Sequence, residues 1–129
     1  MGPHLNAVAA GIKQIVDNLR AADITSLGIG IVAYRDLDIR PTGEDPTNPM
    51  AGGPMEMLPM KRVDEAHFAS LTDFTAKLKP NGHGNKGLPE DVCGGLRNSM
   101  AMLDASVAPV KAIIMFADAP CHGRMFHDL

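Results

Sequence analysis

The stretch that decides the fold is Lys111-Ala-Ile-Ile-Met-Phe-Ala-Asp-Ala-Pro-Cys-His-Gly123, in which an apolar run ends abruptly at Asp118 and a proline turn. The run is apolar without alternation, which is typical of a strand buried on both faces, the habit of parallel strands in α/β domains. We therefore expect a parallel strand over residues 111–117. Asp118 would then lie at its carboxyl end, where open α/β sheets bind their ligands.

Upstream of this run, hydrophobic periodicity predicts three helices and two further strands. Apolar residues recur at helical spacing over residues 5–19, over residues 65–78 and after Pro89-Glu-Asp91. The buried stripe expected for the third helix is Val92, Leu96, Met100 and Leu103. Residues 27–33 read as a strand whose glycines let a helix pack closely, and residues 57–63 as a short strand that Pro59 confines to a sheet edge.

The order of these elements predicts the fold class. Residues 40–59 carry five prolines and three glycines and are expected to form a long loop before the edge strand. Helices alternating with apolar strands favour an α/β fold with right-handed crossovers. We expect a doubly wound, mostly parallel sheet with helices on both faces.

Composition and charge exclude some classes of partner and indicate the cellular compartment. The chain has 129 residues, a formal net charge of −3 and no basic cluster, so neither nucleic acid nor an anionic membrane is an expected partner. No apolar stretch approaches the ~18 residues of a spanning helix, and the first residues do not resemble a signal peptide. We expect a cytoplasmic chain in which Cys93 and Cys121 are reduced.

Three motifs carry a family resemblance: Tyr34-Arg-Asp36, Pro89-Glu-Asp-Val-Cys-Gly-Gly-Leu96 and Ala117-Asp-Ala-Pro-Cys-His-Gly123. Their order and spacing resemble the von Willebrand factor type A domain of the kind attached to some α-type protein kinases, and the match covers most of the chain. The resemblance implies a non-enzymatic protein-interaction module with a metal-ion-dependent adhesion site at the carboxyl ends of its strands. No kinase motif occurs in this sequence, and an attached α-kinase domain is an implication of the resemblance alone.

The resemblance also implies that the metal site is degenerate or incomplete. Asp118 matches the family's third ligand, whereas Leu88 stands at the position of the threonine ligand and cannot ligate a hard cation. The family's Asp-x-Ser/Thr-x-Ser motif would fall before Met1. Residues 1–129 would thus be a partial domain that lacks the first strand and the C-terminal elements. We expect no cofactor here, with Mg²⁺ binding only in a longer form and Asp118 otherwise capping the turn that follows it.

Two functional interpretations remain open from the residues. In the first, a protein partner binds a rim at the strand ends formed by Tyr34, Arg35, Asp36, Asp118 and His122. In the second, the chain is a fragment of a Rossmann-like enzyme that uses Cys121 as a nucleophile or holds zinc. The zinc ligands would be Cys121, His122, His127 and Asp128. Adjacent side chains on an extended segment point in opposite directions, so Cys121 and His122 form a poor catalytic pair and we favour the first interpretation.

Overall fold

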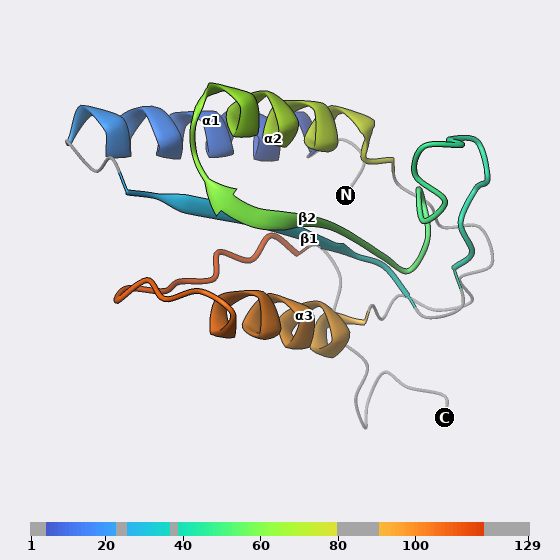
Figure 1. Ribbon diagram of the computed structural model, residues 1–129. Helices are drawn as coiled ribbons and strands as arrows, with labels where there is room; N and C mark the ends of the chain where they lie inside the picture. The colour runs from blue at the N-terminus through green and yellow to red at the C-terminus, as the bar shows by residue number, and fades with distance from the viewer. Residues whose placement is uncertain (1–4, 23–25, 37–38, 80–90, 118–129) are drawn as a thin grey trace.

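The computed structural model describes residues 5–22, 26–36, 39–79 and 91–117 of the chain. In this part, three helices and two strands follow one another as α1 (Leu5–Ala21), β1 (Gly28–Tyr34), β2 (Met55–Arg62), α2 (Glu65–Lys77) and α3 (Val92–Asp104). Figure 1 shows the sheet between two helical layers, with α1 and α2 on one face and α3 on the other. The three predicted helices and the strands near residues 27–33 and 57–63 are confirmed.

Local sequence signals fix where two of the helices begin. The side chain of Asp64 accepts a hydrogen bond from the backbone N–H of His67 at 2.7 Å and caps α2. Asp91 does the same for α3, accepting from the N–H of Gly94 at 2.9 Å. A carboxylate at this position satisfies a backbone donor that has no partner within the helix and faces the positive end of the helix dipole.

The two strands pair in the antiparallel direction. The register runs from Gly28 opposite Arg62 to Tyr34 opposite Met55, with an irregularity between Ile29 and Ile31. The long connection over residues 35–54 includes most of the loop predicted over residues 40–59, whose last five residues belong to β2. The N–H of Arg35 donates to the carbonyl of Pro54 at 2.8 Å and closes the base of this loop beside the end of β1.

The predicted doubly wound, mostly parallel sheet is wrong for the described residues, where the sheet has two strands and they are antiparallel. Residues 111–117 form no strand, and every one of them is exposed. The apolar pattern predicts a strand that is buried on both faces. A strand forms, however, only where a neighbouring strand supplies hydrogen bonds. No strand of the described chain pairs with this segment.

Few hydrophobic side chains of the described residues are buried around this sheet. Among the described residues the buried hydrophobic side chains are Val16, Ile39, Leu71 and Val92. The stripe expected on α3 is only partly buried, because Leu96 is 36% exposed and Met100 is 57% exposed. Two glycines bring α3 close to β1: a Cβ on Gly30 would collide with the Met102 side chain, and a Cβ on Gly95 would lie 2.6 Å from the Tyr34 ring.

Candidate functional site

A polar cluster forms where β1 ends. Tyr34 is the last residue of the strand, and Arg35 and Asp36 follow it. Arg35 is 9% exposed and Asp36 is 8% exposed, so both are buried. Burying a charged side chain costs free energy unless the charge is paired and hydrogen-bonded. Both side chains therefore need partners within the protein.

Arg35 is held by three partners from distant parts of the chain. Its Nη1 donates to the carbonyl of Gly53 at 2.6 Å, and its Nη2 donates to the carbonyl of Lys79 at 2.8 Å. Nη2 also lies 2.7 Å from Oε2 of Glu56, which is itself only 6% exposed. The guanidinium thus joins the long loop, the segment that follows α2 and strand β2 at a single point.

Glu56 completes this cluster on β2. Its Oε1 accepts a hydrogen bond from the side-chain amide of Asn48 at 3.3 Å. Its Oε2 is buried, accepts no hydrogen bond from any described residue and forms the ion pair with Arg35. The attraction between these two groups is therefore Coulombic, and removing Arg35 would leave a buried carboxylate oxygen without compensation.

The predicted partner-binding rim lies partly in the described chain. Tyr34, Arg35 and Asp36 do lie together at the carboxyl end of β1, but Arg35 is committed to the contacts above and Asp36 also interacts with the surrounding protein. Tyr34 is half-buried beside Gly95 of α3. Asp118 and His122 lie outside the described residues, so the rim as a whole stays a prediction.

The metal and enzyme interpretations depend on residues that the structure does not describe. Asp118, the predicted Mg²⁺ ligand, is among them, as are Leu88 and the cluster Cys121, His122, His127 and Asp128. Within the described ranges, no group of three or more histidine, cysteine, aspartate or glutamate side chains is arranged to hold a metal ion. Both interpretations stay predictions.

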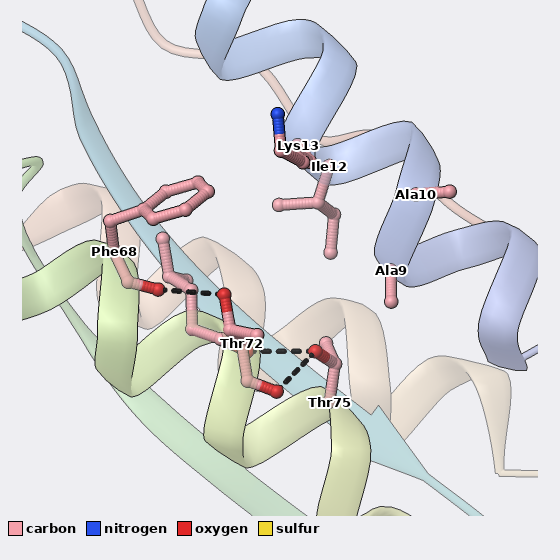
Figure 2. A pocket seen from close by; sticks show the side chains of 8 residues that line it. Ala9, Ala10, Ile12, Lys13, Phe68, Thr72 and Thr75 are labelled. Atoms are coloured by element: carbon pink, nitrogen blue, oxygen red, sulfur yellow. Dashed lines mark hydrogen bonds between the residues drawn. The ribbon is translucent and has the colours of Figure 1, made fainter.

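A groove of about 300 Å³ separates α1 from α2 (Figure 2). Alanines on α1 leave this space open, and its walls are mostly apolar. The hydroxyl of Thr72 donates to the carbonyl of Phe68 at 3.0 Å, and that of Thr75 to the carbonyl of Leu71 at 2.8 Å. Since both hydroxyls are used within α2, the groove offers little to orient a ligand.

A second hollow, between the long loop and α2, contains charges that are already paired. Lys77 forms an ion pair with Asp73 at 2.9 Å, and the hydrogen bond that Lys77 donates to Asp73, together with the negative charge of Asp73, raises the pKa of Lys77. Asp45 accepts hydrogen bonds from the hydroxyl and the N–H of Thr47 at 2.6 and 2.8 Å, which lower the pKa of Asp45. These are loop and helix contacts rather than a catalytic arrangement.

His67 is a buried residue that the sequence analysis did not single out. It is 5% exposed, and its Nε2 lies 2.7 Å from the carbonyl oxygen of Ile29. A carbonyl oxygen can only accept, so the ring nitrogen donates and ties α2 to β1. The helical spacing of this residue on the apolar side of α2 was the one available signal for its burial.

In the described part of the chain, a set of large exposed apolar residues lies on α3 and on the segment that follows it, and Figure 1 shows these two stretches on one side of the sheet. We call this set the apolar surface, and its residues are Leu96, Met100, Val107, Val110, Ile113, Ile114, Met115 and Phe116. Their exposure runs from 36% for Leu96 to 101% for Val107. Lys111 is the single charged residue between positions 107 and 117. The same apolar run that predicted a buried strand is thus exposed and contributes to the apolar surface.

No known protein family, no curated protein and no solved structure matches this chain. Among the helices that the structure describes, none has the length and apolar character needed to cross a membrane.

Proposed function

We propose that this chain is a non-enzymatic protein-interaction module whose apolar surface is covered by another polypeptide. The observation that carries the proposal is the exposure of eight large apolar side chains on one side of the sheet. Seven of the eight are at least 41% exposed. The largest apolar patch on a typical monomer is about 300–600 Å², and larger ones mark interaction sites.

The expected partner is a protein. The segment of this surface over residues 107–117 contains one charged residue, Lys111, and such depletion of charge is typical of the core of a protein–protein interface, where methionine and aromatic residues are enriched. The resemblance to von Willebrand factor type A domains supports the same class of function. A cytoplasmic location belongs to the proposal and is supported by cysteine usage, because two cysteines in 129 residues do not suggest a disulfide framework.

The proposal is tested by photo-cross-linking in cells that express the complete protein naturally. A photoreactive phenylalanine analogue replaces Ile114, which is 62% exposed on the apolar surface. The matched control carries it at Gln14, which is exposed on α1 across the sheet. We expect one defined protein adduct from position 114 and none of the same mass from position 14. Identical adducts from both positions, or none from either, would overturn the proposal.

A further inference from the structure

Methionines of the described chain differ in what surrounds their sulfur atoms. Two of them are half-buried against glycines of β1. A Cβ on Gly28 would lie 3.4 Å from Cγ of Met60, and a Cβ on Gly30 would collide with Sδ of Met102. Four others are between 46% and 57% exposed, namely Met50, Met57, Met100 and Met115. The last two belong to the apolar surface.

Met100 and Met102 lie on different faces of α3. Successive residues of an α-helix are about 100° apart around the axis, so these two positions are separated by about 200°. Since Met102 lies against β1, Met100 points away from the sheet, on the same side as Leu96 one turn earlier. A chemical change at Met100 therefore alters the apolar surface and leaves the contact between α3 and β1 in place.

Met115 also lies where a change of its side chain spares the fold. It is outside the described helices and strands, in the segment that follows α3. Its neighbours Ile114 and Phe116 are 62% and 42% exposed, so the three residues form a continuous exposed apolar stretch. Both sulfur atoms of the apolar surface are thus accessible to small molecules from solvent.

We propose that Met100 and Met115 are oxidation sites, and that their conversion to methionine sulfoxide prevents the apolar surface from binding its partner. The inference rests on the proposed function and adds a form of regulation to it. The oxidant is hydrogen peroxide. A lone pair of the thioether sulfur attacks one peroxide oxygen, the S–O bond forms and the O–O bond breaks. The sulfur is oxidised by two electrons, and the second oxygen leaves as water with the proton of the first.

Oxidation changes the chemistry of this surface in one direction. It converts a flexible apolar side chain into a polar one, and methionine sulfoxide reductases reverse the change. A partner that covers the sulfoxide oxygen removes its water, which is unfavourable unless a donor replaces it. Lys111 has the one polar side chain in residues 107–117, so the segment supplies few donors. We expect the two sulfoxides together to weaken binding at least about tenfold.

The test uses the purified 129-residue chain with the photoreactive phenylalanine analogue in place of Ile114. The chain is treated with hydrogen peroxide, catalase stops the reaction, and a thiol reductant reverses the first oxidation step of the cysteines. Mass spectrometry of peptides should find Met100 and Met115 at least about threefold more oxidised than Met102, because oxidation follows exposure. Circular dichroism should show unchanged helix content.

The treated chain is then irradiated in an extract of the cells that express the protein naturally. We expect at least about tenfold less of the adduct that the untreated chain forms, and recovery of this adduct after incubation with methionine sulfoxide reductases. In Met100→Leu/Met115→Leu, peroxide should no longer lower the adduct yield, whatever that yield is before treatment. The matched control, Met50→Leu/Met57→Leu, removes two exposed sulfur atoms outside the apolar surface and should lose the adduct as the unsubstituted chain does.

The possible outcomes separate this inference from the proposed function. An undiminished adduct from a chain whose Met100 and Met115 are sulfoxides would overturn the inference and leave the proposed function intact. A loss of adduct that Met100→Leu/Met115→Leu does not prevent would do the same, as would faster oxidation at Met102 or a loss of helix content. Absence of the adduct before any treatment would overturn the proposed function and this inference together.

Discussion

Arg35, a predicted residue of the partner-binding rim, contributes contacts that hold the fold together. Its guanidinium contacts the carbonyls of Gly53 and Lys79 and the carboxylate of Glu56. The sequence places Arg35 correctly at the end of a strand. It could not reveal that the compensating carboxylate lies on the next strand, across a long loop, because such pairing depends on tertiary contact rather than on local pattern.

We predict that Arg35→Met lowers the free energy of unfolding by about 3 kcal/mol, because it leaves the buried carboxylate of Glu56 unpaired. Arg35→Lys should lose less, since it keeps the charge but not the forked donors. Urea denaturation measures both. The control is Lys13→Met, which removes an exposed ion pair to Asp17 and should change stability by less than about 0.5 kcal/mol. Equal effects of Arg35→Met and Lys13→Met would contradict this role.

Asp45 gives a prediction about pH. The hydroxyl and the N–H of Thr47 donate to its carboxylate, so its pKa should lie below the ordinary 3.8 in the folded chain. A pKa that is lower when folded means that this contact stabilises the fold above the unfolded pKa and is lost as pH falls through the folded one. An NMR titration of the Asp45 carboxyl should show a low midpoint that rises in Thr47→Val. The same midpoint in both proteins would show that the hydroxyl does not matter.

At the scale of elements, the contact between α3 and β1 depends on two close approaches that only glycine permits. The sequence suggested this for the glycines of β1, and Gly30 does lie against Met102. Helical spacing also predicted α1 and α2 closely. β2, which carries Pro59, is an edge strand of the described sheet, as is β1, because the sheet has two strands. On α3, hydrophobic periodicity predicted that Leu96 and Met100 are buried, and this is wrong because both are exposed. Periodicity identifies the apolar face of a helix but not the element that covers it.

A matched pair of helical glycines tests the contact between α3 and β1. Gly95→Ala should destabilise the protein by about 1–3 kcal/mol, since the new methyl group would overlap the ring of Tyr34. Gly11→Ala on α1 meets no atom within 4 Å and should stabilise by about 0.5–1 kcal/mol through helix propensity alone. Thermal and urea unfolding report both changes. A gain in stability from Gly95→Ala would mean that α3 does not pack closely on β1.

At the scale of the whole molecule, the expected parallel sheet failed because its evidence was local. The apolar run over residues 112–117 has the composition of a buried strand, yet residues 111–117 have no strand to pair with in the described chain and lie exposed. Parallel pairing joins strands that are distant in the sequence. The local sequence of one strand therefore does not indicate whether a second strand is present to pair with it. The predicted metal ligand Asp118 depended on that same strand.

The exposed apolar surface makes a last prediction, which contrasts two substitutions of large apolar residues. Leu71→Ala removes a side chain that is 1% exposed and should cost about 2–5 kcal/mol. Ile114→Lys alters a side chain that is 62% exposed and should change stability by less than about 0.5 kcal/mol, while reducing the fluorescence of a bound hydrophobic dye such as ANS. Urea unfolding and dye titration measure the two effects. If Ile114→Lys instead costs as much as Leu71→Ala, then Ile114 is buried by the chain's own fold in solution, and the apolar surface is not available to a partner.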